Sequence, residues 1–337
     1  MFDTIKELSL LCGTSGREKK VREYIISRID GKCEWHEDAL GNIIAFKKGK
    51  NQASHKIMLD AHTDEVGVIV TFITSDGMLK FSPVGGIDTK VLLARQIIFD
   101  NGITGVVGIK PIHLSKGDER TKIPDADSLY IDIGAASEEE AKKLIKIGET
   151  GVFLSDFVEF GDNRIKGKAL DDRVGCAILI DMINSELNYD AYFSFSVQEE
   201  IGLRGAMTSA YGIDPEYAIV LETTTAADLI DVPDHKKVCR LGEGAAVSFM
   251  DRSTLYNKDL FDTAFRLAEE KGIKVQPKTV IAGGNNAGSI HKTRAGIKTI
   301  TINTPCRYLH SPSCVCDKRD IESQRQLAEA LLDEFAK

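Results

Sequence analysis

The chain has 337 residues, of which 42% are hydrophobic and 28% are charged, and its formal net charge is −8. This composition is typical of a globular protein, and its negative balance argues against a nucleic-acid partner, because phosphate binding needs a concentrated basic surface. No apolar run approaches the ~20 residues of a membrane span, and Asp3 and Glu7 make the N-terminal segment unlike a signal peptide. We therefore expect a cytoplasmic protein that does not bind membranes.

The N-terminal part of the chain predicts two amphipathic helices and then strands. Residues 3–11 and 16–29 place apolar side chains at helical spacing. A hairpin with its turn near residues 40–42 follows. The apolar runs "KIMLDAH" (56–62) and "VGVIVTFI" (66–73) predict the next two strands.

The middle of the chain has a different pattern of apolar and turn-forming residues. From about residue 70 to 161, short β-like runs such as "QIIFD" and "ITGVVGIK" are separated by Gly and Pro, with one helix at "SEEEAKKLIK". Helices and strands alternate afterwards, with helices at 173–187, 259–271 and 317–335 and strands at 192–197, 217–221 and 298–303. This order predicts an α/β fold, a mostly parallel-stranded mixed sheet flanked by helices, interrupted by a small inserted β-rich domain.

Acidic and histidine side chains follow the predicted strands. One strand leads into Asp60, His62 and Asp64, and others lead into the acidic or imidazole side chains Glu199, Glu200, Glu222 and His310. In open α/β sheets, ligands bind beyond the carboxyl ends of the strands. We therefore expect these side chains to meet in one crevice.

The pair Asp171 and Asp172 precedes the helix predicted from residue 173. A helix N-cap explains one Asp at such a place. The second Asp leaves two interpretations open, a capping pair or a carboxylate that bridges metal ions.

The combination of these groups favours metal ions. Several carboxylates in one crevice without cations would be driven to bind protons. Imidazole together with carboxylate suits Zn, Co or Mn better than Mg or Ca, and a carboxylate that binds no metal is then needed to move protons. The adjacent Glu199 and Glu200 supply one group for each task. The constellation predicts a hydrolase with two divalent metal ions per subunit.

Five blocks of the sequence resemble the tetrahedral (TET) aminopeptidase family, which includes glutamyl and deblocking aminopeptidases and the branch with CelM-type endoglucanase names. The blocks occur in family order between about residues 60 and 315, and they are "AHTDEVG", "GKALDDRVG", "VQEEIGLRGA", "GGNNAGSIH" and "CRYLHSP". The resemblance implies a zinc-peptidase-like catalytic fold. It also implies an enzyme, a metallo-aminopeptidase that acts on peptide substrates.

The resemblance implies a role for each matching side chain. Asp171 would bridge two metal ions, His62 and Glu222 would complete one site, and Glu200 and His310 would complete the other.

Two further roles are carried over in the same way. Glu199 would be the general base and acid. Asp64 would hydrogen-bond to His62 and fix its tautomer. Glu199 and Asp64 are thus the expected catalytic residues, and neither is expected to bind metal.

The resemblance also implies the domain organisation and the assembly. Residues 1–67 and 163–337 would form the catalytic domain, and residues 68–162 would form an inserted barrel-like or PDZ-like domain that makes dimers. Dimers of family members assemble into hollow dodecamers. The chain departs from the family pattern at Glu222 and Asn286, where many members have Asp.

Other interpretations stay open at this point. The same site would suit a metal-dependent glycosidase or deacylase, and a shell-forming assembly protein without activity is a further alternative. The Gly-rich "GGNNAG" lacks the Lys of a phosphate-binding loop and is expected to be a tight turn near the substrate. Among the remaining histidines, His291, close after this block, is the strongest candidate for a place near the site.

Overall fold

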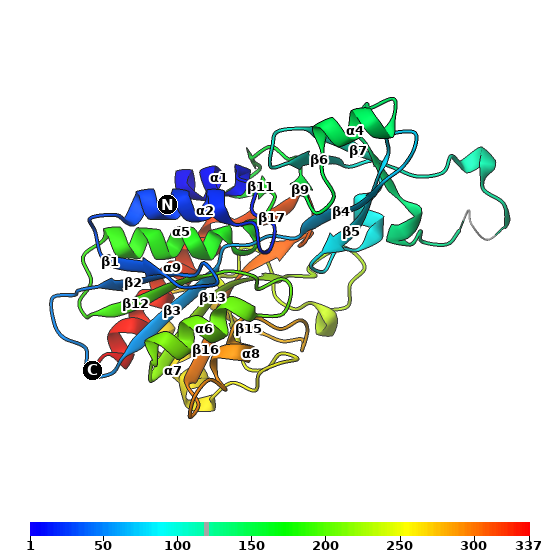
Figure 1. The fold of residues 1–337 in the computed structure, drawn as a ribbon. Helices are drawn as coiled ribbons and strands as arrows, with labels where there is room; N and C mark the ends of the chain where they lie inside the picture. Colours follow the sequence, from blue (N-terminus) through cyan, green and yellow to red (C-terminus); the bar gives the residue numbers. More distant parts are fainter. Residues whose placement is uncertain (118–120) are drawn as a thin grey trace.

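The computed structural model describes residues 1–117 and 121–337, which form two units (Figure 1). The helices are α1 (Phe2–Leu10), α2 (Lys19–Ile29), α3 (Thr89–Leu92), α4 (Glu138–Leu144), α5 (Leu170–Asn184), α6 (Arg204–Ile213), α7 (Lys258–Lys271), α8 (Ala287–Ile290) and α9 (Lys318–Phe335). The strands of the larger unit are β1 (Glu34–Glu37), β2 (Ile43–Lys47), β3 (Ile57–His62), β10 (Val158–Phe160), β11 (Arg164–Gly167), β12 (Ala191–Ser196), β13 (Tyr217–Thr225), β14 (Ala245–Ser248), β15 (Val275–Lys278), β16 (Lys298–Arg307) and β17 (Cys314–Asp317). The strands of the smaller unit are β4 (Gly67–Ile73), β5 (Leu79–Val84), β6 (Gln96–Phe99), β7 (Thr104–Gly108), β8 (Tyr130–Asp132) and β9 (Thr150–Phe153).

The larger unit is built on a mixed sheet. Its strand order is β1-β2-β12-β3-β13-β16-β17-β11-β10, with β14 paired to β16 and to β15. The central strands β12, β3, β13 and β16 pair in parallel, and the strands outside them pair antiparallel, apart from β14 with β15. The central strands are almost wholly buried, as expected for parallel strands covered on both faces.

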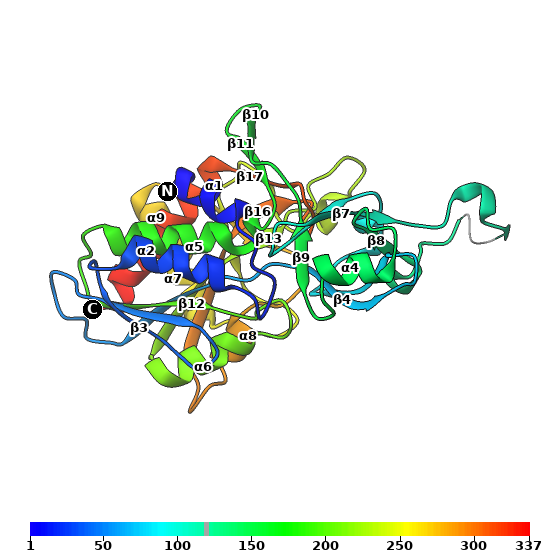
Figure 2. The same cartoon turned by 45° about the horizontal axis from the view of Figure 1, so that its top comes forward.

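Helices cover both faces of this sheet (Figures 1 and 2). One core contains apolar side chains of α1, α2, α5, α7 and α9, and a second core on the other face contains those of α6 and α8. The predicted α/β fold, a mixed sheet flanked by helices, is therefore confirmed. No helix within 1–117 or 121–337 is both long enough and apolar enough to cross a membrane.

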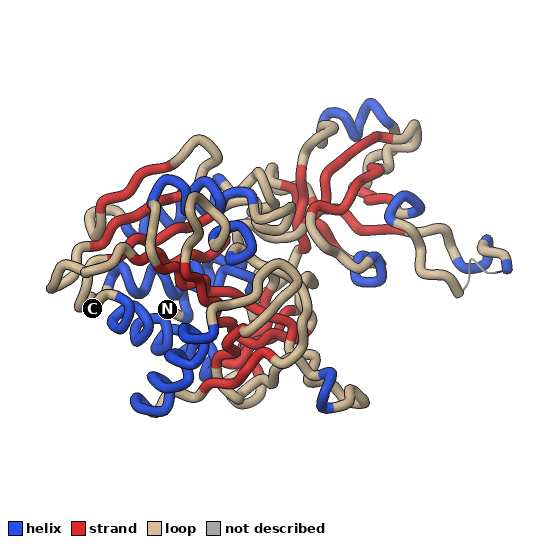
Figure 3. The backbone as a smooth tube through the Cα atoms, turned by 90° about the horizontal axis from the view of Figure 1, so that it is seen from below, coloured by secondary structure: helices blue, strands red, loops and turns tan. Residues whose placement is uncertain are grey.

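The smaller unit is a closed barrel with the strand order β4-β5-β8-β7-β6-β9. It has its own apolar core, which extends in sequence from Val66 to Phe153, and it stands apart from the large sheet in Figure 3. The predicted β-rich inserted unit is confirmed as a barrel. β10, at residues 158–160, pairs with β11 in the large sheet, although it lies within the predicted inserted range 68–162. The exact domain boundaries stay a prediction.

One predicted helix start differs from the structure, and a second agrees with it once the backbone geometry is considered. The second helix begins at Lys19 instead of residue 16, because Gly16 has a φ of +79° and its amide donates to Glu18 Oε1 in a turn. α5 is assigned from Leu170, but Asp171 and Asp172 have non-helical dihedral angles, so regular helix begins near residue 173 as predicted. These two residues form the turn that presents Asp171.

Candidate metal centre

The carboxyl ends of the parallel strands bring the predicted residues together. His62 is the last residue of β3, and Glu199 and Glu200 follow β12. Strand β13 extends to Thr225 instead of ending at residue 221, so Glu222 lies within the strand and is only 6% exposed. His310 follows β16 at the same edge of the sheet. All seven residues predicted for catalysis or metal binding therefore lie around one centre.

The two adjacent Asp residues have different environments. Asp172 Oδ1 accepts a hydrogen bond from the Gly175 amide at 3.0 Å, which is the geometry of a helix N-cap. Asp171 Oδ1 lies 3.2 Å from His62 Nε2, and Asp171 Oδ2 lies 3.4 Å from His310 Nε2. The capping interpretation therefore applies to Asp172, and the side chain of Asp171 lies between the two histidines.

Two groups of possible ligand atoms share Asp171. In one group His62 Nε2 also lies 3.6 Å from Glu222 Oε1, and in the other His310 Nε2 lies 3.3 Å from Glu200 Oε1. The possible ligand atoms within each group all lie within 4.8 Å of one another. Each group can therefore offer one imidazole and two carboxylates to a single ion.

The tautomers of both histidines agree with metal binding. His310 Nδ1 lies 2.7 Å from the carbonyl oxygen of Gly86, and His62 Nδ1 lies 3.1 Å from the carbonyl oxygen of Asp64. A carbonyl oxygen only accepts hydrogen bonds, so each Nδ1 carries the proton and donates it. Each Nε2 then faces carboxylate oxygens, a place where either a proton or a shared cation can lie between nitrogen and oxygen.

Burial and mutual repulsion perturb the acids of the centre. Burial, followed by the charge of Asp171, raises the pKa of Glu222 to about 8. Burial also raises the pKa of Glu199 well above its usual range, and the nearby Glu222 and Glu200 act in the same direction. Although burial opposes it, hydrogen bonding to Asp171 and Glu200 raises the pKa of His310 to about 12. The protein therefore concentrates more negative charge here than it neutralises with its own side chains.

Asp64 connects several parts of the centre. Its Oδ1 accepts from the Glu199 amide at 2.9 Å and lies 3.4 Å from His62 Nδ1. Its Oδ2 accepts from the Glu200 amide at 3.1 Å and from Ser15 Oγ at 2.6 Å. The fully buried Asp64 thus holds both the His62 ring and the backbone that carries the two glutamates.

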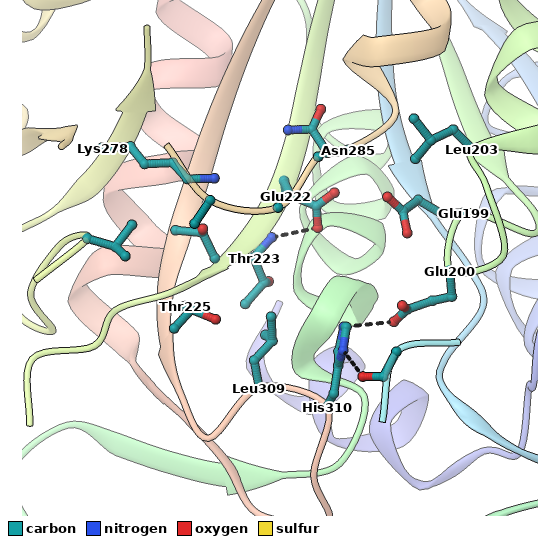
Figure 4. Close-up of a pocket in the computed structure, with 16 residues that line it drawn as sticks. Glu199, Glu200, Leu203, Glu222, Thr223, Thr225, Lys278, Asn285, Leu309 and His310 are labelled. Atoms are coloured by element: carbon teal, nitrogen blue, oxygen red, sulfur yellow. Dashed lines mark hydrogen bonds and ion pairs between the residues drawn. The ribbon is translucent and has the colours of Figure 1, made fainter. Parts of the chain in front are cut away.

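A cavity of about 420 Å³ opens beside the centre (Figure 4). Glu199, Glu200, Glu222 and His310 lie at one side of it, and Gly86 of the inserted unit also lines it. Its volume suits a small ligand or one end of a larger one. The residues that line it are Gly86, Glu199, Glu200, Leu203, Glu222, Thr223, Thr224, Thr225, Val238, Lys278, Ala282, Gly283, Gly284, Asn285, Leu309 and His310.

The segment "GGNNAG" contributes to the cavity wall through its first three residues, Gly283, Gly284 and Asn285. Asn286 is buried behind them, and its Nδ2 donates to Asp60 Oδ2 at 2.7 Å. Asn at this position therefore avoids a second carboxylate beside Asp60. His291 Nδ1 lies 2.6 Å from the carbonyl oxygen of Ala287, a local contact within one turn of helix.

Three charged side chains that support the centre were not predicted. Lys168 Nζ lies 2.7 and 2.8 Å from the two oxygens of Glu65, and Arg173 Nη2 lies 3.2 Å from Glu65 Oε1. Lys168 and Arg173 lie before and after the Asp171 turn in the sequence, and all three side chains are buried. A Lys and an Arg that flank two Asp residues are the signal in "GKALDDRVG", but only the fold brings Glu65 to them.

Comparison with known sequences identifies the family. The profile of the M42 glutamyl aminopeptidase family matches residues 41–327. A protein of Acetivibrio thermocellus that bears an aminopeptidase name is 39% identical over 336 residues, which cover 98% of each chain. The lysyl aminopeptidase of Pyrococcus furiosus is 35% identical over 345 residues, covering 99% of this chain and 97% of that protein.

Solved structures agree with the sequence comparison. The aminopeptidase APDkam598 of Desulfurococcus kamchatkensis has a TM-score of 0.93 at 34% identity, covering 98% of this chain and 94% of that one. The TET1 peptidase of Pyrococcus horikoshii, described as assembling into a tetrahedron or a large octahedral shell, has a TM-score of 0.85 at 34% identity and 98% coverage of both chains. A Thermotoga maritima structure named an endoglucanase has a TM-score of 0.81 at 37% identity, covering 98% and 96%. The chain belongs to the M42 glutamyl aminopeptidase family of peptidases.

Proposed function

We propose that this peptidase is a binuclear, metal-dependent aminopeptidase that removes N-terminal residues from short peptides. The observation that carries this proposal is the position of Asp171, whose two carboxylate oxygens face two different histidines at 3.2 and 3.4 Å. A carboxylate placed in this way can bridge two cations.

The donor chemistry fits two divalent ions. Asp171, His62 and Glu222 would hold one ion, and Asp171, Glu200 and His310 would hold the other. Mixed imidazole and carboxylate ligands suit Zn, Co or Mn. Both histidines offer Nε2 because Nδ1 donates to a backbone carbonyl.

The chemistry assigned to the centre is hydrolysis of the first peptide bond. Bound divalent metals would supply Lewis-acid polarisation of the scissile carbonyl and lower the pKa of a water molecule. Glu199, which is absent from both ligand groups, is the general base that accepts a proton from the attacking water. As the carbon–nitrogen bond breaks, Glu199 gives this proton to the leaving amine.

Asp64 positions the groups that react. Its hydrogen bond from the Glu199 amide holds the base, and its contact with His62 Nδ1 orients that imidazole. The acidic side of the cavity also provides an electrostatic environment that favours the free α-amine of a substrate. A peptide with a blocked N-terminus is therefore expected to be a poor substrate.

Removal and return of metal tests this function. The protein is treated with EDTA and assayed on aminoacyl-p-nitroanilides, and Zn, Co and Mn are then restored in separate samples. We expect activity to disappear with the metal and to return with at least one ion. Activity that survives complete metal removal would contradict the proposal.

A second candidate is another hydrolase activity at the same centre, because one structural relative bears an endoglucanase name. Cellulose oligomers and acyl-amino acids are therefore assayed beside the peptides with the same metal-loaded protein. Glycosidases normally use two opposed carboxylates without metal, which favours the peptidase assignment. A protein that binds metal but turns over none of these substrates would instead fit a shell-forming protein without activity.

We also propose that the inserted unit makes dimers that assemble into a dodecamer. The TET1 relative forms shells, and the loop between β7 and β8 exposes Ile112, Leu114 and Ile123 by 72%, 53% and 56%. Exposed apolar groups of this kind mark contact surfaces. Native mass spectrometry of the full chain distinguishes a dodecamer from smaller species. A cytoplasmic location remains a prediction from composition.

A further inference from the structure

Residues 283–285 form part of the cavity wall beside the metal centre, and Asn286 follows them. Gly283, Gly284 and Asn285 line the cavity (Figure 4). The segment belongs to no helix or strand and leads directly into α8, which begins at Ala287. Two successive glycines give its backbone many accessible conformations, so the contacts of the two asparagine side chains must select one of them.

The two asparagine side chains are bound to different strands of the large sheet. Asn285 Oδ1 accepts from Thr301 Oγ1 of β16 at 3.3 Å. Asn286 Nδ2 donates to Asp60 Oδ2 of β3 at 2.7 Å and to Ser196 Oγ of β12 at 2.8 Å. The cavity wall is therefore attached to the sheet at two points.

Asp60 and Asn286 form a complementary buried pair. Asp60 is 0% exposed and Asn286 is 1% exposed. A buried carboxylate needs hydrogen-bond donors, and Asp60 Oδ2 receives them from Asn286 Nδ2 at 2.7 Å and from Ser196 Oγ at 3.3 Å. An acid at position 286 would instead place two carboxylates at hydrogen-bond distance inside the protein, where like charges repel strongly.

The strands that hold Asn286 also carry residues of the metal centre. Asp60 lies two residues before His62 on β3, and Ser196 ends β12 three residues before Glu199. The amide group of Asn286 thus connects the cavity wall to the strand of a possible metal ligand and to the strand that leads to the proposed base. A displacement of this amide would change the distance between the wall and the centre.

We propose that Asn286 is a positioning residue, whose pairing with Asp60 holds the cavity wall at the place that substrate binding needs. The kinetic consequences of this inference rest on the proposed aminopeptidase function. The inference also gives a reason for the departure from the Asp that many family members have at this position. In this chain the acid of the pair lies at position 60, so position 286 must supply the donor, and the two residue types depend on each other.

Exchange of the two residue types tests the pairing in the metal-loaded full-length protein. Asn286→Asp opposes two carboxylates, and we expect kcat/KM for the best aminoacyl-p-nitroanilide to fall by about 10- to 100-fold, chiefly through KM. Asp60→Asn combined with Asn286→Asp restores one donor and one acceptor, and the Ser196 hydroxyl can serve either as donor or as acceptor. The double variant is expected to regain KM to within about three-fold of the wild type.

Asn188→Asp is the matched control. Asn188 Nδ2 donates to Asp333 Oδ2 at 2.8 Å, so this substitution also opposes two carboxylates. The pair is exposed and lies before β12, at the other end of that strand from Glu199. Both kcat and KM are expected to stay unchanged in this variant.

Metal analysis accompanies the kinetics, and every variant is expected to keep its metal. An unchanged KM in Asn286→Asp, or a double variant that is no better than the single one, would overturn the proposal. Metal loss in Asn286→Asp would do so as well, because the pair would then support His62 and not the wall. If Asn286→Asp does not fold alone, Asn286→Ala takes its place, and the double variant must still fold and retain the wild-type KM.

Hydrogen exchange separates failure of this inference from failure of the proposed function, because it requires no turnover. The amides of Ser289 and Ile290 both donate to the carbonyl oxygen of Asn286 at 3.0 Å. Peptides that contain residues 283–290 are expected to exchange faster in Asn286→Asp and as slowly as the wild type in the double variant, as measured by mass spectrometry. This result supports the positioning role even if no p-nitroanilide is cleaved. Equal exchange in the three proteins would show that Asn286 does not hold the wall.

Discussion

His310 Nδ1 donates to the carbonyl oxygen of Gly86 at 2.7 Å, so a residue of the inserted unit orients an imidazole of the catalytic unit. Gly86 follows β5 of the barrel, and His310 follows β16 of the large sheet. The hydrogen bond sets the tautomer that leaves Nε2 facing Asp171 and Glu200. The segment after barrel strand β5 therefore helps to orient a residue of the centre, in addition to any role of the barrel as a contact surface.

Two neighbouring glycines test this connection. A Cβ on Gly85 would lie 2.8 Å from Val66 Cγ1 and 3.3 Å from Glu200 Cβ, and Gly85 has a φ of +82°. Gly85→Ala is expected to lower kcat and to cost about 1–2 kcal/mol of stability for the left-handed backbone alone. At Gly86 the nearest atom would be His310 Nδ1 at 3.6 Å, an ordinary contact, so Gly86→Ala serves as the control that retains the carbonyl. Similar kcat values and thermal midpoints for both variants would contradict this account.

Asp64→Asn is expected to lower kcat by about 10- to 100-fold, as is typical for a group that orients a metal ligand. The reason is that Asn offers one acceptor oxygen where Asp64 uses two, toward the amides of Glu199 and Glu200. Ser15→Ala removes a single hydrogen bond to the same carboxylate and is expected to cost only about 2- to 10-fold. Steady-state kinetics with parallel metal analysis measures both. Equal effects of the two substitutions would argue against the positioning role.

Glu199→Gln separates proton transfer from metal binding. We expect the variant to keep its metal content and to lose turnover by about 100-fold or more, because glutamine cannot accept the proton from water. Glu200→Gln is the matched comparison, because Glu200 Oε1 lies 3.3 Å from His310 Nε2 and Glu200 belongs to a possible ligand group. Elemental analysis should show metal loss in Glu200→Gln alone. Metal loss in Glu199→Gln would mean that the two roles are exchanged.

The adjacent acids Asp171 and Asp172 should respond differently to substitution. Asp171→Asn is expected to abolish binding of both proposed metal ions, because this carboxylate belongs to both ligand groups. Asp172→Ala removes the acceptor of the Gly175 amide and is expected to lower stability by about 1 kcal/mol, with metal still bound. Elemental analysis and thermal unfolding distinguish the two effects. Loss of metal in Asp172→Ala with an unchanged unfolding temperature would reverse the assignments.

We expect a pH dependence of stability that arises from Asp320, a residue outside the metal centre. It is buried in the first turn of α9 and accepts from the Gly242 and Gly244 amides at 2.7 Å each. Burial raises the pKa of Asp320 from 3.8 to about 7. Between these values the folded protein holds a proton that the unfolded chain has released, so this group's contribution to stability falls as the pH rises.

Asp320→Asn provides the comparison, because its side chain stays neutral at every pH. The difference in unfolding temperature, wild type minus variant, is expected to fall between about pH 4 and 7 and then to level. A difference that rises with pH would show that the folded-state pKa of Asp320 is lowered instead.

The strand-end pattern predicted much of the fold and of the centre. Continuous apolar runs required buried parallel strands, and parallel strands place their carboxyl ends at one edge. The sequence alone therefore grouped His62, Glu200, Glu222 and His310. The helices α1, α2, α5, α7 and α9 were predicted, whereas α6 and α8 were not, and the change in residue pattern after residue 70 indicated a small β-rich unit.

Local sequence could not separate residues whose surroundings come from distant segments. Asp171 and Asp172 are the same residue type in adjacent positions, and only the turn before α5 directs one toward the histidines and the other toward the Gly175 amide. Glu65 is a second case, because it pairs with the buried Lys168 and Arg173, which lie more than a hundred residues away in sequence.

The amino-acid sequence alone determined the type of chemistry, because residue types and their order along the chain limit which ligands are available. The tertiary structure decided which oxygen of Asp171 faces which histidine, and which acid pairs with the buried Lys168 and Arg173. Hydrogen bonds and ion pairs depend on distances of a few ångströms between segments more than a hundred residues apart. Those distances are set by packing of the whole chain, which no local pattern contains.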